Sequence, residues 1–121
     1  MNLLYFKDLH RAGGRIRHVF PLHQRALLDL LAMLPESVDE VWVFGSTLTL
    51  RCGQDSDLDV CLVGDVRLED TKDLWVLQGV PLDLVLVGKS EFYNHPHAPD
   101  SIYHSIQTNG LKIWDREEGL Q

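Results

Sequence analysis

The sequence predicts an α/β (α+β) fold in which several strands form a sheet flanked by helices. Residues 57–63 and 82–87 form nearly continuous apolar runs of strand length, which is typical of central strands buried on both faces. Residues 38–44 are rich in β-branched and aromatic side chains and end at a glycine, which indicates another strand. Helical spacing of apolar residues before and after these strands predicts the covering helices.

The chain of 121 residues fits a single domain. Residues 1–20 mix glycines with basic groups and show no clean period, so we treat them as an N-terminal extension of unknown role and assign the domain to residues 21–121. The first helix of this domain begins at Pro21, a favourable first helical residue, and stops before Pro35. The apolar positions that follow helical spacing are Leu27, Leu28, Leu31 and Leu34.

The connections on the carboxyl-terminal side are less regular in pattern. Residues 67–78 are compatible with either a connecting helix or an irregular crossover. Residues 94–99 contain two prolines and predict a loop, after which a helix is expected to end at Asn109-Gly110. Residues 111–114 then predict a last short strand.

Charge and cysteine content limit the classes of partner. Eleven Lys and Arg against eighteen Asp and Glu give a formal net charge of -7, which argues against a long nucleic-acid partner because such binding needs a basic face. Cys52 and Cys61 form neither a disulfide framework nor a metal-binding spacing. The apolar stretch of residues 1–6 is too short for a signal peptide or a membrane span. We therefore expect a cytoplasmic protein without a membrane segment.

Three acidic residues interrupt the apolar strands. An ionised carboxylate among Val and Leu costs several kcal/mol or more unless a cation or hydrogen bonds compensate for the lost hydration. Asp57 and Asp59 are two apart, so they share one strand face and lie roughly 7 Å apart along the backbone. If the strand carrying Asp83 is a neighbour, three carboxylates meet at one edge of the sheet. Carboxylate oxygens suit Mg²⁺, so these residues are candidate metal ligands.

The turn at Gly45-Ser46 adds a candidate phosphate site. A glycine lets backbone amides approach a ligand, and the short helix expected from Thr47 to Arg51 would offer N–H groups to an anion. Carboxylates at this spacing can hold two cations about 3.5–4 Å apart, as in two-metal phosphoryl and nucleotidyl transfer. In such chemistry Asp83 is the candidate general base or its metal-bound assistant.

These residues resemble the DNA polymerase β-like nucleotidyltransferase superfamily. The shared pattern is Gly45-Ser46, ten intervening residues, Asp57-Leu58-Asp59, and Asp83 on a neighbouring strand. The likeness runs from about Pro21 to Trp114 and is greatest to the minimal nucleotidyltransferases, small proteins without a polymerase thumb or fingers. It implies the nucleotidyltransferase fold, a small mixed β-sheet flanked by helices, with Asp57, Asp59 and Asp83 as catalytic metal ligands.

The resemblance also implies a reaction and partners. Minimal nucleotidyltransferases use Mg²⁺, here two ions, with an NTP substrate such as ATP. They frequently pair with a helical HEPN toxin, and several act as antitoxins that add AMP to a tyrosine of the toxin. The expected function is therefore the transfer of a nucleoside monophosphate, AMP from ATP, to a hydroxyl of a protein partner, either a HEPN-like toxin or a separate acceptor-binding subunit.

Two positions depart from the family pattern. Many minimal members carry Arg after Gly-Ser and Gly three residues later, where this chain has Thr47 and Leu50. Arg51 could supply the missing positive charge beside Gly45-Ser46, or it could be a solvated arginine at a helix end.

Two alternative functions stay open at this point. One is a non-catalytic antitoxin-like binding module that keeps the fold as a scaffold. The other is a transferase that acts on a small molecule such as an aminoglycoside. The sequence does not name the base or the acceptor, and it leaves open whether the protein is an oligomer.

Overall fold

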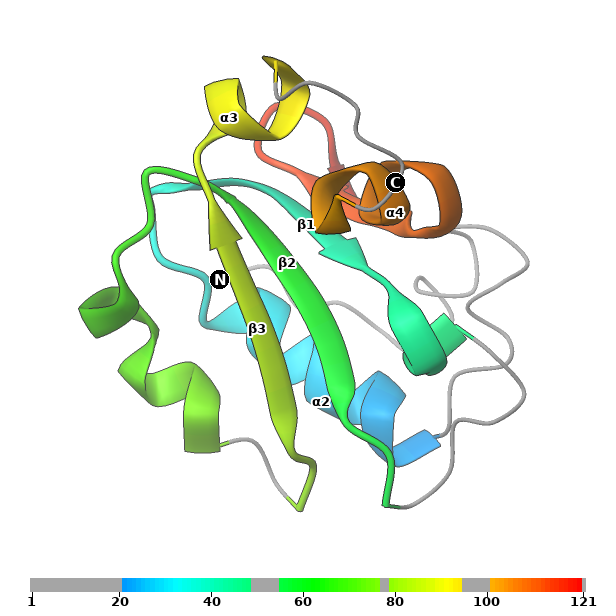
Figure 1. The fold of residues 1–121 in the computed structure, drawn as a ribbon. Coiled ribbons are helices and arrows are strands. Elements are labelled where there is room, and N and C mark those ends of the chain that lie inside the picture. Colours follow the sequence, from blue (N-terminus) through cyan, green and yellow to red (C-terminus); the bar gives the residue numbers. More distant parts are fainter. Residues whose placement is uncertain (1–20, 49–54, 77–78, 95–100, 121) are drawn as a thin grey trace.

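The computed structural model describes residues 21–48, 55–76, 79–94 and 101–120 (Figure 1). Three α-helices, two 3₁₀ helices and five strands lie in these ranges. In chain order they are α2 (Pro21–Ala32), β1 (Val38–Val43), η2 (Gly45–Leu48), β2 (Leu58–Gly64), η3 (Leu68–Val76), β3 (Leu82–Val87), α3 (Lys89–Asn94), α4 (Ile102–Asn109), β4 (Leu111–Asp115) and β5 (Gly119–Leu120). No helix in these ranges is both long and apolar enough to cross a membrane.

The five strands form one mixed sheet in the order β3-β2-β1-β4-β5. Strand β2 pairs antiparallel with β1 and parallel with β3, and η3 makes the crossover that parallel pairing requires. The mixed sheet flanked by helices confirms the predicted fold class.

Helices cover both faces of the sheet (Figure 1). Behind the strands in this view, α2 packs on one face and shares a buried cluster with alternate β2 residues such as Val60 and Leu62. On the other face, Phe92 of α3 and Ile106 of α4 pack against Cys61 of β2. Every residue of β2 is buried, because helices cover both its faces and strands pair with both its edges.

The prediction that residues 82–87 form a central strand is wrong, because β3 lies at the edge of the described sheet. Its Leu84 packs into the cluster on the α2 face and its Val85 into the opposite cluster, so both faces need apolar side chains. Only β2 pairs with it, however, and most of its side chains stay partly exposed. An apolar run therefore reports that both faces are covered, not that both edges are paired.

Most other sequence-based elements agree with the structure. The helix before Pro35, the helix closed at Gly110 and the strand after it correspond to α2, α4 and β4. The ambiguous crossover is the 3₁₀ helix η3, whereas α3 and β5 had no counterpart in the sequence analysis. The predicted loop falls outside the described residues apart from Asn94, which ends α3.

The thiol of Cys61 is buried in the cluster that α3 and α4 form with the sheet. Burial, together with the smaller effect of the nearby Glu40 carboxylate, raises the pKa of this thiol to about 12. The thiol therefore stays protonated at neutral pH and acts as a small apolar side chain, not as a nucleophile.

Phe92 joins α3 to the sheet and is fully buried. Its ring lies 5.5 Å from that of Trp42 and 6.2 Å from that of Tyr103, measured between centroids. Phe92→Ala should lower the free energy of unfolding by about 3–5 kcal/mol, because it leaves a cavity between these rings. Urea denaturation measures this loss. Leu68→Ala is the control, since Leu68 is 67% exposed, and its effect should stay within about 0.5 kcal/mol; equal losses would contradict the assignment of Phe92 to the core.

Candidate active site

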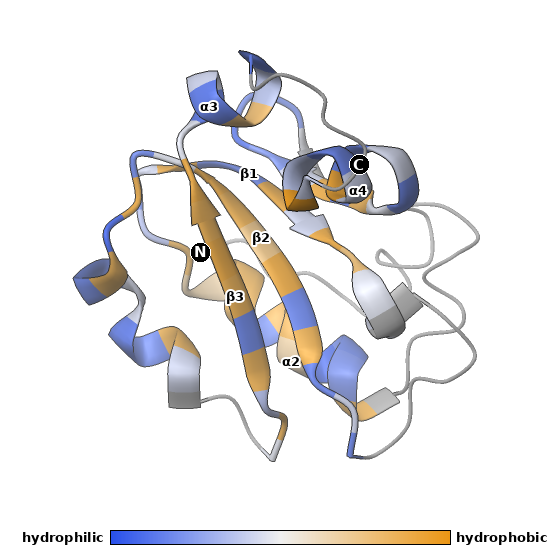
Figure 2. Ribbon diagram, in the orientation of Figure 1, coloured by the Kyte–Doolittle hydropathy of each residue, from blue (hydrophilic) through white to orange (hydrophobic). Residues whose placement is uncertain are grey.

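The parallel ladder between β2 and β3 brings two of the predicted acids together. Asp59 is the direct register partner of Asp83. Asp57 immediately precedes β2 and, by alternation, projects to the same side as Asp59. In Figure 2, hydrophilic positions interrupt the otherwise apolar β2 and β3 side by side. This face of the sheet is the one that α3 and α4 cover further along both strands.

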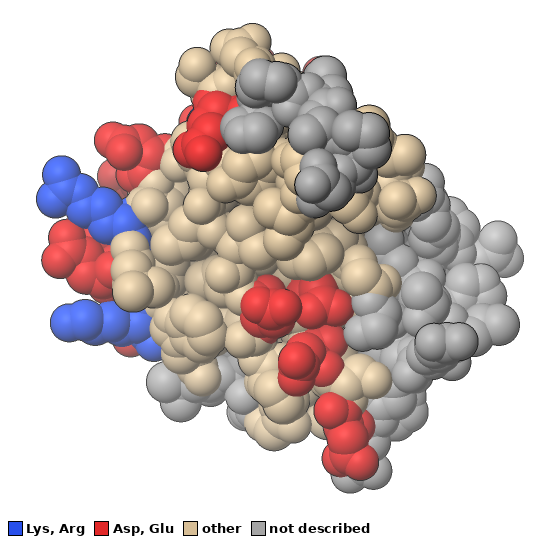
Figure 3. Space-filling view, in the orientation of Figure 1, with Lys and Arg blue, Asp and Glu red and all other residues tan. Residues whose placement is uncertain are grey.

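The acids are exposed to different degrees. Asp57 and Asp83 are exposed, whereas Asp59 is only 8% exposed. Figure 3 shows acidic side chains gathered on the surface over β2 and β3. In the described ranges, α3 and α4 pack against the carboxyl-terminal halves of these strands, beyond the positions of the three acids.

Gly45 forms the bend that follows β1, and it touches the buried acid. Its φ of 66° lies in the left-handed region that glycine adopts without strain. A Cβ atom at this position would lie 2.7 Å from Oδ2 of Asp59, closer than real contacts allow. Glycine is therefore needed twice here, for the backbone conformation and for the close approach to the carboxylate.

The rest of the predicted phosphate turn is described only in part. Ser46 lies in η2, a single 3₁₀ turn that ends at Leu48 within the described residues. Arg51 and Leu50 lie outside the described residues, as does most of the helix predicted from Thr47 onward. The roles of Ser46 and Arg51 in phosphate binding stay predictions.

Thr47 is a site residue that the sequence analysis did not find. Its side chain is fully buried, and its hydroxyl accepts a hydrogen bond of 2.9 Å from the backbone N–H of Asp59. The same hydroxyl donates toward the Asp57 carbonyl at 3.3 Å and toward Oδ2 of Asp59 at 3.4 Å. The sequence analysis named Thr47 only as a departure from the family pattern. No spacing of residues predicts a hydrogen bond between two positions that are twelve residues apart.

His23 of α2 contacts the residue that precedes Asp57. This buried side chain of α2 places Nε2 2.5 Å from the carbonyl oxygen of Ser56, which precedes Asp57. A carbonyl can only accept, so Nε2 carries the hydrogen in this contact. The scattered histidines gave no signal in the sequence, since the contact joins a helix to a segment 33 residues away.

The donor set fits Mg²⁺ in chemistry, although the carboxylates do not form a closed cluster. Across the described ranges, no three His, Cys, Asp or Glu side chains are close enough to enclose a metal ion. The candidate ligands are Asp57, Asp59 and Asp83. Their oxygens are the ligands that Mg²⁺ prefers, and the pairing of Asp59 with Asp83 puts two of them on one face.

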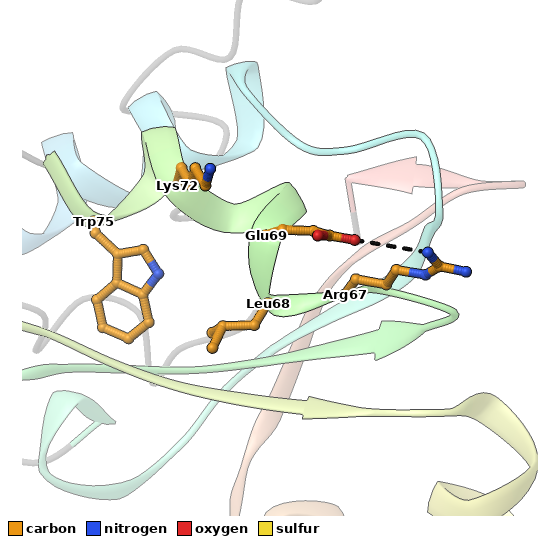
Figure 4. A pocket seen from close by; sticks show the side chains of 5 residues that line it. All are labelled: Arg67, Leu68, Glu69, Lys72 and Trp75. Atoms are coloured by element: carbon orange, nitrogen blue, oxygen red, sulfur yellow. Dashed lines mark ion pairs between the residues drawn. The ribbon is translucent and has the colours of Figure 1, made fainter.

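A separate hollow of about 630 Å³ lies on the crossover η3. Figure 4 shows its lining, which is Arg67, Leu68, Glu69, Lys72 and Trp75. An ion pair of 3.6 Å joins Arg67 to Glu69, and Leu68 and Trp75 supply the apolar wall. None of the predicted site residues is among these five.

Gly45→Ala tests the close packing of the bend against Asp59. Gly79→Ala is a matched control, because Gly79 has a φ of 64° but open space where a Cβ would lie. The control should lose about 1 kcal/mol of unfolding free energy from backbone strain alone, and Gly45→Ala about 1–2 kcal/mol more from the contact with Oδ2. Thermal or urea denaturation of both variants measures the difference. Equal losses would show that the bend can move away from the carboxylate.

The geometry agrees with a match to a known domain family. The model of the nucleotidyltransferase domain matches residues 24–109, which include Gly45 and all three acids. Among solved structures, the chain is similar to a candidate nucleotidyltransferase from Sulfolobus solfataricus, with 18% identity, a TM-score of 0.48, and coverage of 94% of this chain and 93% of that one. No curated protein sequence matches. Because the domain match spans most of the chain, this protein belongs to the nucleotidyltransferase domain family.

Proposed function

We propose that this chain is an adenylyltransferase-like enzyme that moves AMP from ATP to a hydroxyl of a protein partner, with Mg²⁺ as cofactor. Membership of the nucleotidyltransferase family supports the reaction class. The observation that carries the proposal is the register pairing of Asp59 with Asp83 beside the Gly45 bend. This arrangement brings hard oxygen ligands and a close backbone approach to one open face of the sheet.

The three acids share one part in the proposed reaction, and Asp83 has a second. Asp57, Asp59 and Asp83 are the residues that would hold Mg²⁺, which when bound neutralises the triphosphate and lowers the pKa of the acceptor hydroxyl. Asp83 takes the hydroxyl proton as the acceptor oxygen bonds to the α-phosphorus. The bond between the α-phosphorus and the bridging oxygen breaks, and pyrophosphate leaves with that electron pair. The exposed position of Asp83 suits a base that must receive and release a proton.

A macromolecular acceptor fits the exposure of the site. Asp57 and Asp83 are both exposed on the surface, so an acceptor group carried on a large partner can reach them. We propose a helical protein encoded beside this chain as the acceptor, a HEPN-like toxin or a separate acceptor-binding subunit. The chain would then act as an antitoxin by modifying its partner.

Transfer of label from α-labelled ATP to the neighbour-encoded protein, in the presence of Mg²⁺, tests this function. Asp57→Asn and Asp59→Asn should each reduce the rate by about 10²-fold or more, because each removes a charge that balances the nucleotide's cations. Asp65→Asn is the control, since Asp65 is an exposed acid just beyond the opposite end of β2. It should leave the rate unchanged.

Three results would separate the alternatives. Label transfer that persists in both Asp57→Asn and Asp59→Asn would refute the catalytic assignment. A calorimetric titration that finds no binding of ATP with Mg²⁺, alongside intact affinity for the partner, would favour the non-catalytic binding module. Label that appears only on an added aminoglycoside would favour the small-molecule transferase.

A further inference from the structure

We infer that Thr47 is a positioning residue that holds the Asp59 carboxylate ready for a divalent cation. This inference rests on the proposed function, because it assigns Asp59 to the cation site. The structure places the Thr47 hydroxyl against both the backbone and the carboxylate of Asp59.

The contacts of Thr47 define that role. Its hydroxyl accepts from the Asp59 N–H at 2.9 Å, a normal length for such a bond. The donor contacts to the Asp57 carbonyl and to Oδ2 of Asp59 are 3.3 and 3.4 Å, longer than the usual 2.7–2.8 Å of an O–H···O bond. The single hydroxyl hydrogen therefore serves two weak acceptors, while the bond to the backbone of Asp59 is the strong one.

Two groups enclose Oδ2 of Asp59. On one side the Gly45 backbone lies so close that no Cβ would fit, and on another lies the Thr47 hydroxyl. Thr47 and Asp59 are both buried, so water competes little with these contacts. A carboxylate held in this way loses less conformational freedom when it binds a cation. Outer-shell partners of this kind are typically worth about 10–100-fold in metal affinity.

Thr71 supplies a matched control for the alternative that Thr47 serves stability alone. It is also fully buried, and its hydroxyl donates to the Leu68 carbonyl at 2.6 Å and accepts from Nε1 of Trp75 at 3.0 Å. It belongs to η3 and contacts none of the candidate acids in these bonds. Thr→Val at either position removes the same hydroxyl from an equally buried place.

The experiment measures Mn²⁺ binding to the purified full chain by calorimetry, together with the thermal midpoint of the metal-free protein. Thr47→Val should weaken Mn²⁺ binding by about 10-fold or more. Thr47→Ser keeps the hydroxyl and should stay within about 2-fold of the wild type. Thr71→Val should lower the thermal midpoint as Thr47→Val does while leaving Mn²⁺ affinity unchanged.

Two outcomes would overturn the inference. One is Mn²⁺ affinity in Thr47→Val equal to that of the wild type, and the other is no Mn²⁺ binding by the wild type at all. A wild type that binds Mn²⁺ in a Thr47-dependent way but transfers no nucleotide would refute the proposed function and leave the inference standing. The Thr47 inference is tested by Mn²⁺ affinity and the proposed function by label transfer. Failure of one can therefore be told from failure of the other.

Discussion

The burial of the Asp59 carboxylate is the constraint on which the candidate site depends. This acid belongs to a strand in which every residue is buried, and its ladder partner is a second acid. Such a group is stable only where hydrogen bonds or a cation replace its lost hydration. The Thr47 hydroxyl donates toward this carboxylate at 3.4 Å, and the Asp59 N–H donates to the same hydroxyl at 2.9 Å. The Gly45 backbone lies close against the same carboxylate.

The two faces of the sheet differ in the side chains that they carry. The α2 face is a continuous apolar cluster that runs along β1 and β2 and reaches β4 through Ile113. The opposite face is apolar only where α3 and α4 cover it, around Phe92 and Ile106, and becomes acidic toward the starts of β2 and β3. One pair of parallel strands thus carries a hydrophobic half that anchors the helices and a polar half that faces the solvent. Neither half could be exchanged without exposing the core or burying uncompensated charge.

Local patterns in the sequence predicted the fold class, most of its elements and the strands that carry the acids. Alternation along one strand places Asp57 and Asp59 on the same side, and a glycine before a short helix predicts the bend. Contacts between distant segments were not predictable. The hydrogen bond from the Asp59 N–H to the Thr47 hydroxyl depends on how η2 folds back on β2. The edge position of β3 was missed because helices on both faces produce the same apolar run as a central strand. The short helix α3, with Phe92 as its one buried residue, is too brief to show a period.

The parallel register between β2 and β3 has a consequence for how this chain can vary in length. Side chains alternate along a strand, so a slip by one residue would turn Asp83 toward the apolar cluster on the α2 face and put a leucine opposite Asp59. Insertions and deletions in the exposed turns of the crossover, such as the one at Gly79, are tolerable only when they leave this pairing unchanged. Natural variants of the domain should therefore differ freely in the length of the crossover while keeping Asp59 and Asp83 paired in the ladder.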